Sequence, residues 1–244
     1  MDNQIYDIRT SKDFSKTTFS GFKKTEVLST LLKSITSNNI EPSCYWCAEC
    51  ICSGYYIELW ELIILFVCKY IHIGNPKLCV YIESCITKFK EIANDIPDEM
   101  QIRNNEYIRK SFAEIICILC KSYRKHPLAE NKIKHDDYDI NNIGDKLKAP
   151  NINYASNIFQ NGDLKEIYIS LNELYYSIDV VKDTMMSCYW IDWIIEFDYN
   201  LRKAKNKLCV CNPRKYVDNE QDQNNIIWLI WDIFFEISKK NTLN

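Results

Sequence analysis

Helical periodicity with very little punctuation is the feature that most constrains the fold of this chain. Only five glycines and six prolines occur among its 244 residues, and these two residue types most often mark turns and helix ends. Apolar residues recur at helical spacing, as in Val27, Leu28, Leu31, Leu32 and Ile35, which places them on one face of a helix. We therefore predict an all-α protein, a helical bundle of about seven to nine helices.

The pattern places the expected helices and their boundaries. Gly74, Asn75 and Pro76 form the strongest boundary, because glycine ends helices, asparagine caps them, and proline is favoured at the first helical position. Gly54 is a second expected stop. The expected helices cover residues 25–35, 42–53, 55–71, 76–93, 104–123, 163–178, 185–206 and 224–240.

Composition along the chain predicts four segments. Residues 1–22 are polar and aperiodic, which indicates an N-terminal arm. Residues 23–125 form a first helical unit, and residues 126–163, rich in Asn, Asp, Gly and Pro, form a linker or long loop. Residues 164–244 form a second helical unit, which we expect to pack on the first as one domain.

The cysteine count bears on the compartment. Twelve cysteines occur, yet the N-terminus shows no apolar signal segment, so we expect free thiols in a reducing intracellular compartment, the cytoplasm or nucleus. The longest apolar runs, 62–68 and 226–231, fall far short of the roughly 20 residues that a membrane span needs. Abundant Asn, Ile, Lys and Tyr are typical of an A/T-rich genome, such as that of a large DNA virus or a protist; for a virus the compartment would be the viral factory.

A tetrapeptide, Ser-Cys-Tyr-Trp, occurs twice, at residues 43–46 and 187–190. Upstream of each copy stands Leu-x-x-Ser-Ile, at residues 31–35 and 174–178, and the gaps differ by one residue. This pattern predicts a duplicated helical hairpin, although a match this short also arises by chance. We expect each serine to cap a helix. We also expect aromatic residues to anchor the packing of the two helices, and these are Tyr45, Trp46, Tyr189 and Trp190.

The stretch from Leu28 to Leu78 resembles the C-terminal oligomerisation region of the replication-associated AAA+ ATPases of the MgsA/RarA type. The matching positions are Lys33, Ile35, Tyr45-Trp46, Gly54 and the turn Gly74-Asn75-Pro76. The resemblance implies a collar-like helical assembly fold, as in clamp loaders, with oligomerisation and contact with replication machinery. It covers only about fifty residues, Ile71-His72 replaces the family's Glu-Asp, and no G-x-x-x-x-G-K-[ST] loop for nucleotide occurs.

Cysteines in C-x-x-C spacing raise the alternative of a zinc-binding structural module. Four of them crowd one expected helix, whose geometry turns the ligands in different directions, so buried structural thiols are the favoured interpretation. Distant second pairs, such as Cys117 with Cys120, keep the metal hypothesis open. The weak zinc candidates are Cys44, Cys47, Cys50, Cys209 and Cys211.

Basic clusters at two helix ends raise the alternative of a nucleic-acid-binding accessory factor. Helix dipoles favour cations there in any case, and the net charge of −3 gives no general attraction to phosphate or to anionic membranes. A groove would require the two clusters to be adjacent, with Tyr123 and Tyr216 as stacking surfaces. The candidate contacts are Lys121, Arg124, Lys125, Arg202, Lys203, Lys205 and Lys207.

No constellation of catalytic residues emerges from the sequence. His72, His126 and His135 are scattered and form no recognisable motif. We therefore expect a non-enzymatic helical assembly or interaction protein with a protein partner or a second copy of itself, with no cofactor, catalytic residue or small-molecule substrate.

Overall fold

The computed structural model describes residues 4–10, 12–124, 131–139, 141–205, 211–212, 214 and 225–243. These residues form an all-α helical fold without a β-strand, as the sequence predicts. The chain divides into two compact units, one of residues 1–66 and 81–122, the other of residues 67–80 and 123–244.

The first unit is built around a helical hairpin. Helix α1 (Lys24–Thr36) packs against α2 (Ile40–Cys52), and α2 packs against α6 (Glu106–Lys121). Helix α3 (Tyr56–Phe66), most of α4 (Pro76–Asp95) and the short α5 (Glu99–Asn104) complete the unit. Its core is aliphatic and aromatic, and includes Leu31, Ile35, Leu59, Ile63, Phe112 and Ile115.

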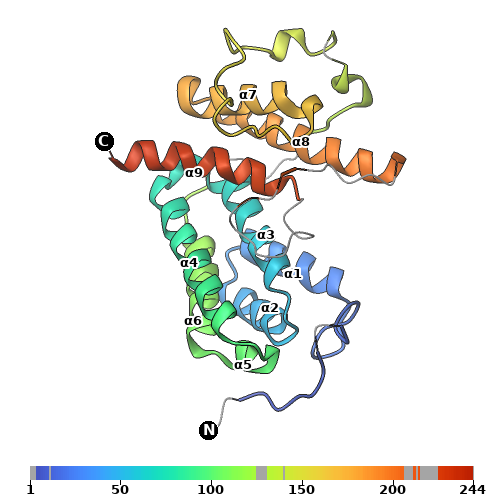
Figure 1. The fold of residues 1–244 in the computed structure, drawn as a ribbon, viewed down its shortest axis with the longest axis vertical. Coiled ribbons are helices and arrows are strands. Elements are labelled where there is room, and N and C mark those ends of the chain that lie inside the picture. The colour runs from blue at the N-terminus through green and yellow to red at the C-terminus, as the bar shows by residue number, and fades with distance from the viewer. Residues whose placement is uncertain are drawn as a thin grey trace. The chain divides into compact units, whose positions relative to one another are not determined.

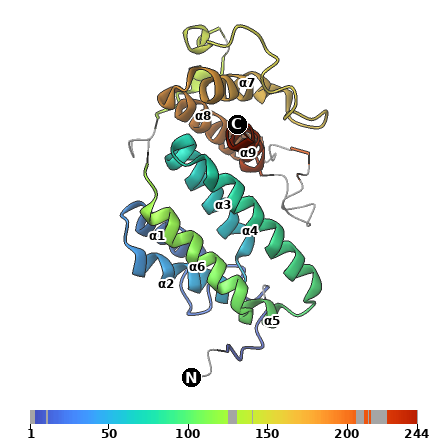
Figure 2. The same ribbon diagram turned by 90° about the vertical axis from the view of Figure 1, so that its left-hand side faces the viewer.

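The second unit contains another hairpin. Helix α7 (Tyr168–Tyr176) continues into a π-helical turn, η6 (Ser177–Val181), and packs against α8 (Thr184–Lys205), as Figures 1 and 2 show. Helix α9 (Ile227–Leu243) and the π-helical turn η1 (Val67–Ile71) belong to the same unit. Short 3₁₀ turns complete it, namely η2 (His72–Gly74), η3 (His135–Tyr138), η4 (Gly144–Lys146) and η5 (Lys165–Ile167).

The predicted helix boundaries at glycine and proline are confirmed. Gly74 ends η2, and α4 begins at Pro76. Gly54 has a φ of +73° after α2, and its N–H and that of Tyr55 donate to the carbonyls of Ile51 and Cys50. This pair of bonds is the Schellman motif, which favours glycine because it requires the left-handed conformation.

The units differ from the predicted division in two ways. Residues 67–80, expected in the first unit, group with the second. Residues 1–22 were expected to form a polar arm, yet Phe14 and Thr18 are buried within the first unit. Apolar periodicity in a sequence indicates regular helices. An irregular segment that docks through a few single contacts has no such periodicity, so the sequence does not reveal its docking.

Candidate functional site: an aromatic surface on a duplicated hairpin

The two Ser-Cys-Tyr-Trp copies occupy the same helical register. Ser43 is the fourth residue of α2 and Ser187 the fourth of α8. Each hydroxyl donates a 2.7 Å hydrogen bond to the carbonyl four residues earlier, that of Asn39 or Asp183. The expectation that these serines cap the helices is therefore wrong, because both lie inside the first turn and bond back to the preceding carbonyl.

The one-residue difference between the two gaps has a structural explanation. After α1, the N–H of Asn39 donates to the carbonyl of Ser34, five residues earlier, at 3.0 Å. After α7, the N–H of Asp183 donates to the equivalent carbonyl of Ser177, six residues earlier, at 2.9 Å. The extra residue is accommodated in the π-helical turn η6, as single insertions into helices commonly are.

The turns that join the two helices of each hairpin both contain a residue in the left-handed conformation, at the equivalent position. Asn38 has a φ of +59° and Lys182 a φ of +58°. Each is followed by one residue and then by the next helix, which begins at Ile40 in one hairpin and at Thr184 in the other. The hairpins therefore share their packing, their turn conformation and their serine bond, which agrees with the predicted duplication.

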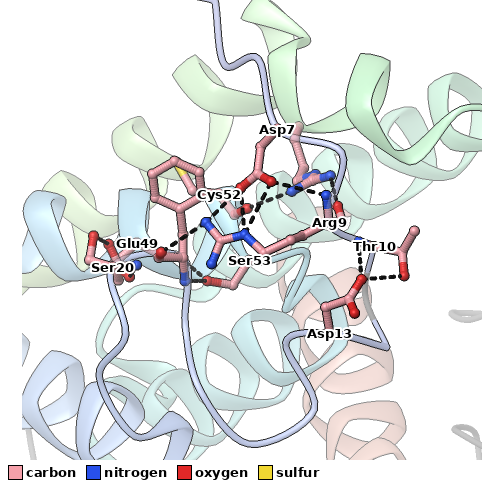
Figure 3. A network of polar contacts seen from close by, with 10 residues as sticks. Asp7, Arg9, Thr10, Asp13, Ser20, Glu49, Cys52 and Ser53 are labelled. Atoms are coloured by element: carbon pink, nitrogen blue, oxygen red, sulfur yellow. Dashed lines mark hydrogen bonds and ion pairs between the residues drawn. The ribbon is translucent and has the colours of Figure 1, made fainter.

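An irregular segment covers the second helix of each hairpin. We call residues 4–10 and 12–23 the first strap, and residues 131–139 and 141–149 the second strap. In the first strap, the N–H and hydroxyl of Ser20 donate to the buried carboxylate of Glu49, at 2.7 and 2.8 Å. The N–H of Phe19 donates to the hydroxyl of Ser53, one turn further along α2, at 2.8 Å (Figure 3).

Two arginines hold the first strap further along its length. Arg9 forms an ion pair with Asp7, and its guanidinium lies 4.8 Å from the ring centroid of Phe14. Arg103 lies 5.4 Å from the same ring and donates to the carbonyl of Arg9 at 2.5 Å. Phe14 is 1% exposed, and its ring lies near two guanidinium groups, contacts that electrostatics favours. Figure 3 shows Asp7 and Arg9 beside Ser53.

The second strap covers α8 with different chemistry. The ammonium of Lys146 lies 4.2 Å from the ring centroid of Tyr189 and donates to its hydroxyl at 2.9 Å. The indole N–H of Trp193 donates to the carbonyl of Asp137 at 2.7 Å. The strap also docks on α7, where the N–H groups of residues 148 and 149 donate to the buried carboxylate of Glu173.

Exposure of the motif aromatics differs between the hairpins. Trp190 is 1% exposed, whereas Tyr45 is 53% exposed and Trp46 is only half-buried. Tyr189 is half-buried beneath Lys146. The four aromatics expected to anchor the helix packing therefore differ in burial: Trp190 fills a core, whereas Tyr45 lies at the surface.

We define the aromatic surface as Phe22, Tyr45 and Trp46. Trp46 makes edge contacts with both neighbours, with ring centroids 5.3 Å from Phe22 and 5.0 Å from Tyr45. Phe22 is itself exposed. Exposed clusters of large aromatic side chains mark interaction surfaces more often than single exposed apolar residues do.

A second exposed apolar cluster lies at the tip of the second hairpin. Val180, Val181 and Met185 are each more than half exposed, and we call these three residues the aliphatic tip. The first two belong to η6, whose extra residue widens the turn. The aliphatic tip therefore accompanies the one-residue insertion that separates the two hairpins.

The cysteines in the described part of the chain are free thiols. Cys47 and Cys50 are buried, and Cys44 lies 3.7 Å from Cys117, measured between sulfur atoms. No group of three or more His, Cys, Asp or Glu side chains in the described ranges could hold a metal ion. Burial raises the pKa of Cys50 to about 12. Of the distant zinc candidates, Cys211 is buried and Cys209 lies outside the described residues.

A buried polar cluster in the second unit has the composition of a catalytic site but not the access. The sulfur of Cys188 lies 3.0 Å from Nε2 of His72, and the ammonium of Lys69 lies 2.8 Å from a carboxylate oxygen of Asp192. Nε2 of His72 also lies 2.7 Å from the carbonyl of Lys69. Cys188 is 0% exposed and burial raises the pKa of its thiol, so a substrate in solution does not reach its sulfur.

The basic candidates divide between the units. Lys121 is exposed in the first unit, whereas Arg124, Arg202 and Lys203 belong to the second. Arg202 is paired with Asp198 at 2.8 Å, which offsets its charge. Lys125, Lys207 and the side chain of Lys205 lie outside the described residues, as do His126 and Tyr216.

Comparison with known proteins gives no assignment: no family model, curated protein sequence or solved structure matches this chain. Among the described residues, none of the helices has both the length and the apolar character needed to cross a membrane.

Proposed function

We propose that this protein is a non-enzymatic helical assembly protein that self-associates through the aromatic surface of its first hairpin. The observation that carries the proposal is the uncovered Tyr45, which is 53% exposed although its counterpart Tyr189 is covered by Lys146. Tyrosine and tryptophan contribute strongly to protein interfaces because they bury large areas with little loss of conformational freedom.

The proposed occupant of the aromatic surface is the aliphatic tip of a second copy of the chain. Both surfaces are apolar and exposed, and they lie on different units. One contact between copies would remove both from water. Such a contact joins two different surfaces, so a pair of copies keeps one unused surface of each kind, and successive copies form a ring or a filament.

The resemblance of residues 28–78 to a collar-like oligomerisation region supports the same proposal. The positions that carry it include Tyr45 and Trp46, which form two thirds of the aromatic surface, and the turn at Gly74, Asn75 and Pro76. A replication-associated role is the part of the proposal that rests on this resemblance alone.

Complementary variants test the proposed contact. Tyr45→Asp places a charge on the aromatic surface and Met185→Asp places one on the aliphatic tip; both sites are exposed, so folding is preserved. Light scattering after size-exclusion chromatography should show wild type as an oligomer and each variant alone as a monomer. An equimolar mixture should give dimers and nothing larger, because one intact surface of each kind remains available.

Tyr199→Asp is the matched control, since Tyr199 is as exposed as Tyr45 but lies outside both surfaces; it should associate as wild type does. A wild-type protein that stays monomeric at high concentration would overturn the proposal, as would a mixture that behaves like either variant alone. A complex with single-stranded DNA that weakens steeply with salt and persists in Tyr45→Asp would instead assign the function to nucleic-acid binding.

A further inference from the structure

Two half-buried thiols of the first unit lie in contact across the packing of α2 and α6. The sulfur atoms of Cys44 and Cys117 are 3.7 Å apart, and each belongs to a C-x-x-C pair on its own helix, with Cys47 and with Cys120. The partners Cys47 and Cys120 are buried. Cys44 and Cys117 are therefore the members of each pair that solvent reaches.

A surface pocket gives small molecules access to one of these thiols. It has a volume of about 270 Å³, and its lining includes Cys44, Cys52 and Arg109. The rest of the lining is Cys47 and apolar residues, with Ile5 from the first strap and Ala48, Ile51 and Ala113 from the helices. A neutral oxidant the size of hydrogen peroxide fits this space easily.

We propose that Cys44 and Cys117 form an oxidation site, at which hydrogen peroxide converts the two thiols into a disulfide that joins α2 to α6. The Cys44 thiolate attacks one peroxide oxygen, the O–O bond breaks, and a sulfenic acid and one water result. The Cys117 thiolate then attacks the Cys44 sulfur, the S–O bond breaks, and a second water leaves.

The reaction balances. The two thiols lose two protons and two electrons, and the peroxide takes up both to become two waters. The sulfur atoms must approach from 3.7 Å to about 2.05 Å. The product would close a covalent link between residues 44 and 117, which stabilises a protein by restricting its unfolded chain.

The site should respond to peroxide slowly at neutral pH and faster at alkaline pH. Burial and the adjacent Cys117 thiol raise the pKa of Cys44 to about 11. Below that value the reactive thiolate is the minor form, so its fraction rises about tenfold for each pH unit. The rate of linking should therefore rise about a hundredfold between pH 7 and pH 9.

Peroxide treatment of the intact chain followed by mass spectrometry tests the site. A non-reduced digest should contain the peptides of Cys44 and Cys117 joined, with the loss of two hydrogens, and the link should vanish on reduction. Cys52→Ser, which changes another half-buried thiol of the same pocket, should keep the link. In Cys117→Ser, a reagent that traps sulfenic acids should label Cys44.

Oxidation of Cys44 to sulfinic acid without a link in wild type would overturn the proposal, as would a preferred link between Cys44 and Cys47. Equal peroxide sensitivity of the buried cysteines would do the same, since it would show oxidation of the unfolded chain. The readout is a covalent mass, so its result is independent of whether the protein self-associates.

Discussion

The two helical hairpins share one scaffold and differ in how it is covered. Each has a serine in the fourth position of its second helix, a left-handed residue at the same place in the turn and a strap over the second helix. The second strap places Lys146 on Tyr189, whereas the first strap leaves Tyr45 more than half exposed. The two hairpins therefore share their backbone arrangement, and the side chains of the straps decide which residues of each hairpin stay exposed.

The residues beneath the straps explain this difference. Positions one and two turns after the motif tyrosine are Glu49 in α2 and Ser53 directly after it in the first hairpin, and Trp193 and Phe197 in α8. The polar pair bonds the backbone of the first strap, whereas the aromatic pair stacks at 5.1 Å between ring centroids and packs against Tyr138. The two straps therefore contact different side chains, a polar pair in the first hairpin and an aromatic pair in the second.

The largest expected effect is the difference in stability cost between substitutions of the two motif tryptophans. Trp190→Ala should lower the free energy of unfolding by about 3–5 kcal/mol, because it removes a fully buried indole and leaves a cavity. Trp46→Ala should cost well under half as much, because its ring is already partly in water. Urea denaturation of both variants checks the comparison, and equal costs would contradict the difference in cover.

A smaller effect is expected at the carboxylates that hold the straps. Glu49→Gln and Glu173→Gln should each cost about 1.5–3 kcal/mol, because each weakens charge-assisted bonds from strap N–H groups. Hydrogen exchange should accelerate at Ser20 in the first variant, and at residues 148 and 149 in the second. Faster hydrogen exchange at the opposite strap in either variant would show that the two straps do not dock independently.

The smallest expected effect concerns the motif cysteines. Cys188→Ala should cost about 1 kcal/mol through the loss of one buried heavy atom, which is less than the cost of Trp190→Ala. Cys44→Ala should cost less still, since Cys44 is only half-buried. Thermal unfolding of the two variants measures both changes. If Cys188→Ala costs as much as Trp190→Ala, the cysteine is a structural anchor and the account of this motif is wrong.

The sequence predicts the helices well because their boundaries and their cores leave local signals. Each of these signals lies within a short stretch of sequence. They are the turn from Gly74 to Pro76, the apolar period of α9, and the paired Leu-x-x-Ser-Ile and Ser-Cys-Tyr-Trp elements. The duplicated hairpin follows from those paired elements, since the one-residue difference between their gaps disturbs neither flanking helix.

Features that depend on single tertiary contacts leave no such signal. The π-helical turn after α7 keeps the apolar pattern of its neighbours, so periodicity does not reveal it. Serine is favoured both as a helix cap and in the first turn, so Ser43 and Ser187 were wrongly predicted to be caps. The straps are polar and aperiodic, and only the structure shows that Ser20 and Lys146 bind the hairpins.

Sedimentation velocity on a matched pair of tyrosine variants tests the central claim, that the exposed Tyr45 takes part in self-association and the covered Tyr189 does not. Tyr45→Ala should abolish association and leave the free energy of unfolding almost unchanged. Tyr189→Ala should keep association and lose stability, because it removes the ring and hydroxyl that Lys146 contacts. Association that survives Tyr45→Ala, or that is lost only in Tyr189→Ala, would contradict the account.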